Sequence, residues 1–316
     1  MKIFILVNSG LEKLAQQEVK ELLDVDAKIY DSVLEVDFDI ESLEKLNQLQ
    51  SAKRVLISLG KSLDNISESD WEQHFSAEKS FKVEVENVKG NENRLGIAKK
   101  VAGMVYAGLD FEPKLELKKP EMLVIVYHNG KDYFVGIDKN VEELNSRKYR
   151  VFAHSASFKG DLAYYFVRKS GFVAGKKVLV GFCKDGTMAI EAALFSKEKV
   201  YGFDSTRQNV TAARKNSQLA GMKDFVDIQK YELDELDVKF SELEFDNLIF
   251  QITSKDENQL NEIYYQSNYI LKKKGKLLLI GRPNWEVTVS EKFKLLEEAE
   301  IKKGESVHKL WLLEKK

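Results

Sequence analysis

A glycine-containing turn after a predicted strand is the first segment of the chain that could bind a cofactor. It reads Val180-Gly-Phe-Cys-Lys-Asp-Gly186-Thr187 and lies between an apolar run that predicts a strand and a run that predicts a helix. Glycines in such a turn let a ligand approach the backbone N–H groups at the helix N-terminus. The same glycines are equally expected in a tight turn that serves only the fold, so this segment alone leaves both interpretations open.

Asp204 is the second candidate, because it directly follows another predicted strand, Val200 to Phe203. In a parallel sheet the carboxyl ends of the strands meet at one edge, and ligands bind there. A carboxylate at that edge could accept hydrogen bonds from both hydroxyls of a ribose. Its alternative role is helix capping, although Ser205 with Gln208 also offers a capping pair.

Basic side chains recur in three short groups. Lys99 and Lys100 lie in one predicted helix, Lys118 and Lys119 precede a predicted hairpin, and Arg147, Lys148 and Arg150 cluster in a later segment. Such residues could neutralise successive RNA phosphates without reading the base sequence. Acidic residues lie between these groups. Charge alone therefore favours an ordinary solvated surface as much as an RNA-binding surface.

No other residues form a convincing catalytic or metal-binding set. His154 lies beside Ser155 and Ser157, but neighbours in sequence seldom point at one another, and no third orienting group is evident. The histidines have no ligand spacing, and Cys183 is the single cysteine. We therefore predict no structural zinc, no internal disulfide and no catalytic residue.

Length and composition limit the class of protein. The chain has 316 residues, of which 43% are hydrophobic and 32% charged, which predicts a folded protein of more than one domain. A formal net charge of -2 excludes a cationic tail-type binder, so any nucleic-acid contact must come from a local basic face. No segment approaches the roughly 20 apolar residues of a membrane span. We expect no membrane partner and a cytoplasmic location.

Hydrophobic patterning predicts two α+β units in the first half of the chain. Residues 1–60 read as a βαββ-type unit. Residues 61–143 read as a second unit, in which Phe81 to Glu86 alternate between apolar and charged residues as a half-buried strand does. The dipeptide Asn129-Gly130 joins the last two strands of that unit and is a strong hairpin signal.

The second half has a different pattern. Residues 144–158 form a linker, and from residue 159 to 316 strands and helices alternate, as in a parallel sheet that is covered on both faces. Near the end, Phe293 to Ala299 are predicted to be helical. Ile301 to Lys303 and His308 to Leu313 are predicted to form an antiparallel edge pair.

Several short segments occur in an order that is typical of a known family. They are Asn8-Ser-Gly-Leu-Glu12, Arg94-Leu-Gly96, Leu144-Asn-Ser-Arg-Lys-Tyr-Arg150, His154-Ser-Ala156, Phe182-Cys183, Gly186-Thr187, Ile190-Glu-Ala-Ala193, Ala213-Arg-Lys-Asn216 and Ala220-Gly221. Together they resemble the THUMP-domain RNA methyltransferases over nearly the full length. The resemblance implies an α/β protein with an N-terminal ferredoxin-like domain, a THUMP RNA-binding domain and a Rossmann-like class I methyltransferase domain.

The same resemblance implies a cofactor and a partner. The cofactor would be S-adenosylmethionine, and the residues that line its site would be Phe182, Gly186, Thr187 and Asp204. The partner would be a structured RNA such as tRNA, and the seven basic residues named above would face it.

The first departure from the family pattern concerns the cofactor loop. Where the family usually has Asp-Pro-Phe-Cys-Gly-Ser-Gly-Thr, this chain has Val180 in place of the acid and Lys184 in place of a glycine. The family's carboxylate helps to hold the cationic end of the cofactor, and Val180 has neither charge nor acceptor. The Lys184 side chain would obstruct close approach by the ligand.

The second departure concerns the loop that meets the target base. The family has Asn or Asp, two prolines and an aromatic residue, whereas this chain has Gln251-Ile252-Thr253-Ser254. Gln251 keeps one polar acceptor, but no ring remains to stack on a flipped-out base. A structural use of the loop is favoured instead, because Ser254 with Glu257 predicts a capping box for the next helix.

Three functions follow from these patterns. The leading hypothesis is an RNA-binding, catalytically degenerate subunit, or pseudoenzyme, that acts on tRNA or another structured RNA with an active methyltransferase paralogue as partner. The alternative is an active S-adenosylmethionine-dependent tRNA guanine-N2 methyltransferase, in which Gln251 would take the polar role at the base. A third interpretation is a protein-interaction scaffold that keeps the old fold without RNA.

Overall fold

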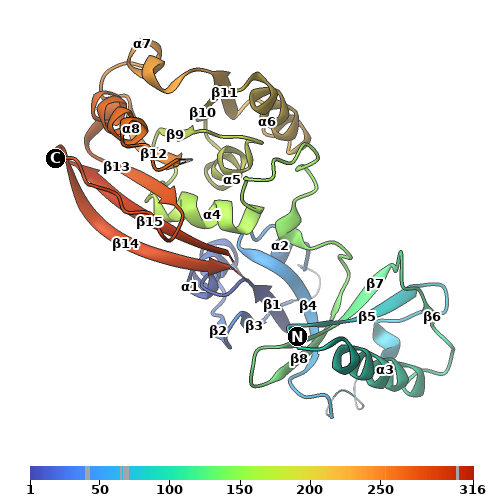
Figure 1. Cartoon of the computed structure of the whole chain (residues 1–316). Coiled ribbons are helices and arrows are strands. Elements are labelled where there is room, and N and C mark those ends of the chain that lie inside the picture. Colours follow the sequence, from blue (N-terminus) through green and yellow to red (C-terminus); the bar gives the residue numbers. More distant parts are fainter. Residues whose placement is uncertain (40–42, 65, 67–70, 253, 304–305) are drawn as a thin grey trace. The chain divides into compact units, whose positions relative to one another are not determined.

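The computed structural model describes the chain as two compact units. The described residues are 1–39, 43–64, 66, 71–252, 254–303 and 306–316. The first unit spans Met1–Asn145 and the second spans Ser146–Lys316 (Figure 1). Each unit has its own sheet, and each is considered by itself below.

The first unit is built on one mixed sheet. Within the described residues that sheet has eight strands in the order β2-β3-β1-β4-β8-β7-β5-β6. Its elements are β1 (Lys2–Val7), α1 (Glu12–Leu23), β2 (Lys28–Ile29), β3 (Val33–Asp37), α2 (Leu43–Leu46), β4 (Ala52–Gly60), the short 3-10 helix η3 (Trp71–Gln73), β5 (Ser80–Glu86), α3 (Asn91–Ala107), β6 (Lys114–Leu115), β7 (Met122–His128), β8 (Tyr133–Asp138) and the 3-10 helix η4 (Leu144–Ser146).

The predicted ranges 1–60 and 61–143 share this sheet. β4 pairs antiparallel with β8, with Ile57 opposite Ile137, so the two halves meet in the middle of the sheet. Val19 of α1 and Val105 of α3 belong to one hydrophobic core on the same face of the sheet. The division at residue 60 stays a prediction, because sheet and core both run across it.

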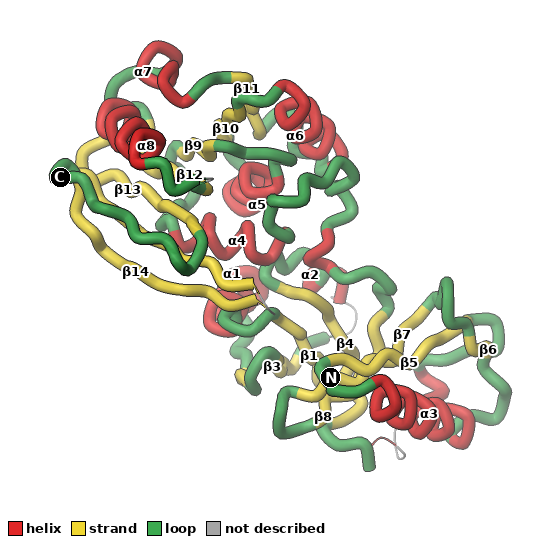
Figure 2. Tube along the Cα trace, viewed as in Figure 1, coloured by secondary structure: helices red, strands yellow, loops and turns green. Residues whose placement is uncertain are grey.

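The second unit is built on a mainly parallel sheet. Its described strands are ordered β11-β10-β9-β12-β13-β15-β14, which is 3-2-1-4-5-7-6 when they are numbered within the unit. The elements are α4 (Gly160–Lys169), β9 (Val178–Gly181), α5 (Thr187–Ser196), β10 (Val200–Asp204), α6 (Arg207–Leu219), β11 (Val226–Lys230), the 3-10 helix η5 (Leu233–Glu235), α7 (Leu236–Lys239), β12 (Phe245–Gln251), α8 (Glu257–Ile270), β13 (Leu271–Gly281), β14 (Phe293–Lys303) and β15 (Ser306–Lys315) (Figure 2).

This topology confirms the predicted Rossmann-like α/β architecture and indicates where such a sheet would bind a ligand. The four central strands read as apolar runs because both faces of the sheet are covered. On one face, Leu236 of α7 and Ile263 of α8 pack in the same core as Phe203 and Phe250 of the strands. The chain leaves β9 toward β10 on one side and returns to β12 on the other. The carboxyl ends of β9 and β12 therefore flank the point at which the strand order reverses, where such sheets bind ligands.

The predicted helix from Phe293 to Ala299 is wrong. These residues belong to β14, which pairs antiparallel with β15. A bulge between Leu295 and Glu297 interrupts the alternation of buried and exposed side chains, so the sequence shows no clear period of two. Pairing along the whole of β15 outweighs the helix propensity of the Leu-Leu-Glu-Glu-Ala stretch.

Two kinds of feature are absent from the described part of the chain. No described helix is both long and apolar enough to cross a membrane. The described residues also contain no group of three or more His, Cys, Asp or Glu side chains placed to hold a metal ion.

Candidate functional site

The loop from β9 to α5 holds several residues in the left-handed backbone region. Phe182 has φ of 52°, Lys184 of 50° and Gly186 of 80°. A glycine is required at position 186, because a Cβ there would lie 2.8 Å from the Cβ of Ala213 on α6. An L side chain in this region costs roughly 1–2 kcal/mol. Contacts elsewhere in the unit must therefore hold the loop at Phe182 and Lys184.

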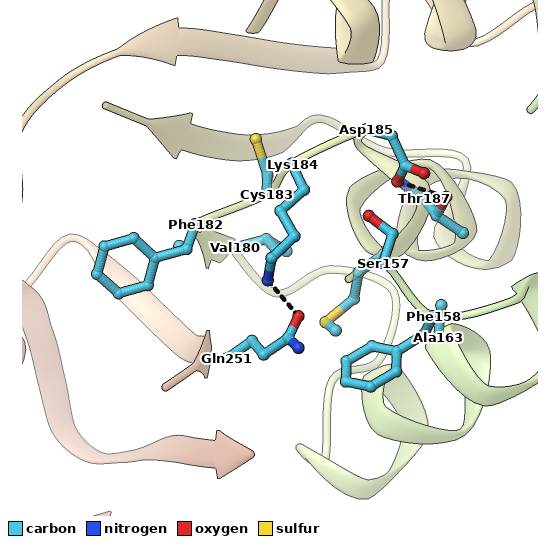
Figure 3. A pocket seen from close by; sticks show the side chains of 12 residues that line it. Ser157, Phe158, Ala163, Val180, Phe182, Cys183, Lys184, Asp185, Thr187 and Gln251 are labelled. Atoms are coloured by element: carbon cyan, nitrogen blue, oxygen red, sulfur yellow. Dashed lines mark hydrogen bonds between the residues drawn. The ribbon is translucent and has the colours of Figure 1, made fainter. Parts of the chain in front are cut away.

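Asp185 supplies many of those contacts at the start of α5. Its carboxylate is fully buried and accepts hydrogen bonds from the hydroxyl of Thr187 at 2.8 Å and the N–H of Thr187 at 3.2 Å. The same carboxylate accepts from Nε of Arg150 at 2.9 Å and the N–H of His154 at 3.0 Å. The Thr187 hydroxyl thus points at Asp185 (Figure 3), and a cofactor contact through Thr187 stays a prediction.

Asp204 lies where the sequence placed it, at the carboxyl end of β10. Its carboxylate is buried, and Oδ2 accepts from the N–H of Lys184 at 2.9 Å. Oδ1 accepts from the N–H of Thr206 at 2.9 Å and from Nδ2 of Asn209 at 3.0 Å. The carboxylate therefore ties the β9–α5 loop to the start of α6, and ribose binding by Asp204 stays a prediction.

The apolar residues of the loop pack inward. Phe182 contacts Phe203 and Phe250, with ring centroids 5.5 Å and 5.9 Å apart. Val180 is buried at the end of β9 and brings no charge to the edge of the sheet. The structure thus brings Phe182, Gly186, Thr187 and Asp204 together around one loop, with Phe182 serving an aromatic cluster.

Lys184 occupies the point at which the strand order reverses. Its side chain is only 7% exposed and reaches from the loop to Gln251 at the end of β12, where Nζ donates to Oε1 (Figure 3). Burial lowers the pKa of Lys184 from 10.5 to about 8, against the opposing attraction of Asp204. A cationic side chain thus bridges the two strand ends that would flank a ligand.

Little space remains around this bridge. The cavity at the edge has a volume of about 20 Å³, and its lining includes Phe158, Phe182, Lys184, Met188 and Gln251 (Figure 3). That volume is roughly what one water molecule needs. A ligand the size of a nucleoside would have to displace the Lys184 side chain to enter.

The loop after β12 lacks the features of a base-binding loop. Gln251 is half-buried, and its Nε2 also donates to the carbonyl of Ala156 at 3.3 Å. Ile252 is buried, and its N–H donates to the carbonyl of Ile280 at 2.8 Å, so it extends the pairing with β13. Thr253 lies outside the described residues. No aromatic residue occupies positions 251, 252 or 254.

The predicted capping box at this loop is wrong by two residues. The N-cap of α8 is Asp256, whose Oδ1 accepts from the N–H of Asn258 at 3.0 Å. Ser254 lies before the helix, and its hydroxyl accepts from the N–H of Asp256 at 3.2 Å. Aspartate caps a helix as well as serine does, and the sequence offers both residue types within three positions.

Arg147 and Arg150, which we predicted to contact RNA phosphates, are bound to carboxylates of their own unit. Arg147 donates from Nε and Nη2 to the two oxygens of the fully buried Glu191, at 2.7 Å and 2.9 Å. Arg150 pairs with the buried Asp185. Because both partners are buried, releasing either guanidinium would leave an unpaired charge inside the fold. These two arginines hold residues 147–158 against α5.

The lysines of the predicted RNA face are placed differently. Lys99 and Lys100 lie exposed on α3, and Nζ of Lys100 is 3.2 Å from Oδ1 of Asp64. Lys118 and Lys119 are exposed between β6 and β7, and Lys148 is exposed in the second unit. An exposed ion pair such as Lys100–Asp64 contributes little stability and opens readily. All five ammonium groups can therefore reach the phosphates of a bound RNA.

Sequence reasoning missed one group of basic residues. Arg207 and Lys215 lie on α6 beside Phe152, and the three line a shared groove. The signal was present, because positions 207, 211 and 215 recur every four residues and share one helix face.

Matches to known families cover most of both units. Residues 63–138 match the THUMP domain, and residues 147–280 match the family described as RMKL-like, methyltransferase domain. The chain therefore combines a THUMP domain with an RMKL-like methyltransferase domain. The resemblance found in the sequence is thereby confirmed, as is the order of the domains.

Known proteins resemble the chain over most of its length. A tRNA (guanine(6)-N2)-methyltransferase of Methanocaldococcus jannaschii is 24% identical over 278 residues, which cover 82% of this chain and 69% of the relative. The crystal structure of TrmN from Thermus thermophilus aligns over 100% of this chain and 99% of its own, with a TM-score of 0.79 and 19% identity. SMU.472, whose structure is complexed with SAH, aligns over 98% of this chain and 97% of its own, with a TM-score of 0.73 and 18% identity.

The residues at the strand ends do not fit S-adenosylmethionine, the cofactor that the family implies. The methionyl end of that molecule carries an ammonium and a sulfonium, both positive. Val180 offers no negative partner, and Lys184 adds a further buried positive charge at the same edge. A cavity of about 20 Å³ has no room for the group while the Lys184 side chain occupies the edge.

Proposed function

We propose that this member of the THUMP methyltransferase family is an RNA-binding pseudoenzyme that acts on tRNA or another structured RNA. The observation that carries the proposal is the Lys184 side chain, which fills the edge between β9 and β12 and donates to Gln251. A cofactor at this edge would have to displace a buried side chain and then meet apolar Val180. Both effects oppose S-adenosylmethionine binding.

The acceptor side supports the same conclusion. Stacking of a base on an aromatic side chain is worth about 1 to 3 kcal/mol, and a preorganised polar contact at a reacting centre about 2.7 to 4 kcal/mol. Ile252 and Ser254 supply no ring, and the Gln251 oxygen already accepts from Lys184. Loss of both contributions would slow methyl transfer by several orders of magnitude.

RNA binding is supported by the THUMP domain and by exposed lysines on the first unit. The THUMP match covers residues 63–138, and Lys99, Lys100, Lys118 and Lys119 lie within it. Contacts of this kind bind the sugar-phosphate backbone of a structured RNA and make the affinity depend on salt.

A salt titration tests the RNA part of the proposal. Anisotropy of fluorescently labelled tRNA gives the dissociation constant at a series of salt concentrations. Replacing Lys99, Lys100, Lys118 and Lys119 together by glutamine should reduce the slope of log affinity against log salt by about 3 to 4, at roughly 0.9 per lost duplex contact. A matched variant with Lys13, Lys28, Lys45 and Lys131 replaced by glutamine loses the same charge from other exposed positions of this unit and should keep most of the slope. Equal slopes in the two variants would refute the assigned face.

A second candidate function is an active S-adenosylmethionine-dependent tRNA guanine-N2 methyltransferase. The similarity to the Methanocaldococcus jannaschii relative favours it. In that case Phe182, Gly186, Thr187 and Asp204 would line the cofactor site, and Gln251 would contact the base. Transfer of a labelled methyl group to tRNA by the purified chain would establish this function and overturn the pseudoenzyme proposal.

The pseudoenzyme proposal includes a protein partner. A chain that binds RNA without modifying it could hold that RNA for an active methyltransferase paralogue. Purification of the native complex should then yield such a paralogue, and the complex should methylate an RNA that this chain alone leaves unmodified. Purification of the chain alone, with no activity gained from any co-purified protein, would contradict this part.

A further inference from the structure

A groove in the second unit shares no lining residue with the cavity beside Lys184. It runs between residues 152–154 and the exposed side of α6, and its volume is about 580 Å³. Its lining includes Phe152, His154, Arg207, Thr211 and Lys215. That volume lies in the range of ordinary small-ligand sites, so the groove has room for a nucleotide.

The wall formed by residues 152–154 is fixed in place. Asn216 of α6 is fully buried, and its Oδ1 accepts from the N–H of Phe152 at 3.0 Å while its Nδ2 donates to the carbonyl of Phe152 at 3.2 Å. The N–H of His154 donates to the buried Asp185. Because these contacts hold the backbone, the Phe152 ring is presented without a large ordering cost on binding.

The side chains of the groove combine an exposed ring with positive charge. Phe152 is 41% exposed, and Nζ of Lys215 lies 4.7 Å from its ring centroid. Arg207 lies on the same helix face, about 12 Å along the axis from Lys215 at 1.5 Å per residue. Among the described residues that line the groove there is no aspartate or glutamate.

We propose that this groove binds a single-stranded segment of RNA. Arg207 and Lys215 contact two phosphates of one strand, and a base stacks on the open part of the Phe152 ring. A ring flanked by cations matches a nucleic-acid strand, since every base has a face that can stack and every linkage carries a negative charge. An acidic peptide would use the cations but would leave the ring without a role.

This inference rests on the RNA binding in the proposed function and adds a surface on the second unit. Positions 207 and 215 are not within the THUMP match, and neither residue contacts the Lys184–Gln251 bridge in the described structure. The groove can therefore be tested whether or not the chain methylates RNA.

The experiment uses the full chain and a labelled twelve-residue oligouridylate as probe. Arg207→Gln with Lys215→Gln should reduce the salt slope by about 1.4, at roughly 0.7 per contact on a single strand. Phe152→Leu keeps an apolar side chain but removes the ring, and should weaken binding roughly 5- to 150-fold. The matched control, Lys223→Gln with Lys230→Gln, removes the same charge from exposed positions outside the groove and should bind as the wild type does.

A cross-link locates the contact independently of affinity. An oligouridylate that carries 5-iodouridine should cross-link on irradiation to the peptide containing Phe152, and the cross-link should vanish in Phe152→Leu. Urea unfolding of each variant should confirm that the fold is retained, as expected for exposed side chains.

Unchanged affinity and unchanged salt slope in the groove variants would overturn the inference. Uridine monophosphate that binds as tightly as the oligomer would also overturn it, because that result would indicate a free-nucleotide site. Binding of tRNA without any binding of the oligomer would overturn the groove and leave the proposed function standing, whereas methyl transfer to tRNA would overturn the pseudoenzyme proposal and leave the groove standing.

Discussion

Replacing Lys184 by methionine tests whether a buried ammonium fills the cofactor edge. Methionine has an unbranched side chain one heavy atom shorter than lysine and the same backbone penalty at φ of 50°, so the main loss is the charge and its hydrogen bond to Gln251. Burial lowers the pKa of Lys184 to about 8 from 10.5 in the unfolded chain. At pH 7 both states are protonated, and the difference corresponds to about 3 kcal/mol against the charged form in the fold. A hydrogen bond to a charged group returns about 1.5 to 3 kcal/mol, so the net gain in the variant at pH 7 should be about 1 kcal/mol.

The pH dependence gives the sharper result. Between pH 8 and 10.5 the unfolded chain binds a proton at Lys184 that the folded chain has released, so the unfolding free energy of the wild type rises with pH in this window. From pH 7 to pH 9.5 the wild type should gain about 2 kcal/mol relative to Lys184→Met. Urea unfolding of both proteins at each pH measures this double difference, and Lys223→Met, at an exposed position, is the control. A constant difference between wild type and Lys184→Met across this range would refute the buried, charged placement of Lys184.

Three further predictions concern the elements that surround the site. Arg147→Met leaves the buried Glu191 carboxylate without its guanidinium partner and should lower the free energy of unfolding in urea by about 3 to 5 kcal/mol. Wild-type tRNA affinity in the folded variant would show that Arg147 has a structural role only, whereas a large loss of affinity would favour a phosphate contact. Gly186→Ala forces a Cβ to within 2.8 Å of Ala213 at φ of 80° and should cost about 2 to 4 kcal/mol, measured in the same way, so a neutral result would contradict the tight packing of α5 on α6. Asp256→Ala should cost about 1 kcal/mol because it removes the N-cap of α8, while Ser254→Ala should cost less; the reverse order would restore the capping box at Ser254.

Much of the fold could be predicted from local patterns. The runs from Lys177 to Val180 and from Phe245 to Phe250 are bounded clearly enough to read as buried parallel strands. The structure has β9 at Val178–Gly181 and β12 at Phe245–Gln251. The β14 strand could not be predicted in the same way, because its bulge hides the alternation and its partner β15 supplies the pairing. Propensity is a weak guide where a long neighbouring strand decides the outcome.

The candidate site was less accessible from the sequence. The substitutions at Val180 and Lys184 were visible as departures from a family pattern, but the bridge from Lys184 to Gln251 joins residues 67 positions apart. The ion pair of Arg147 could not be predicted, because its partner, Glu191, lies 44 residues further along the chain. A buried ion pair of this kind has no local signature, and an RNA contact by Arg147 stays a prediction.

Calorimetric titration of the purified chain with S-adenosylmethionine, with and without saturating tRNA, tests the central claim most directly. We expect heat of binding from tRNA, no heat from S-adenosylmethionine in either titration, and no labelled methyl group on the RNA afterwards. Saturable binding of one S-adenosylmethionine per chain, together with its loss in Gly186→Ala, would contradict the account and place a working cofactor site where Lys184 now lies.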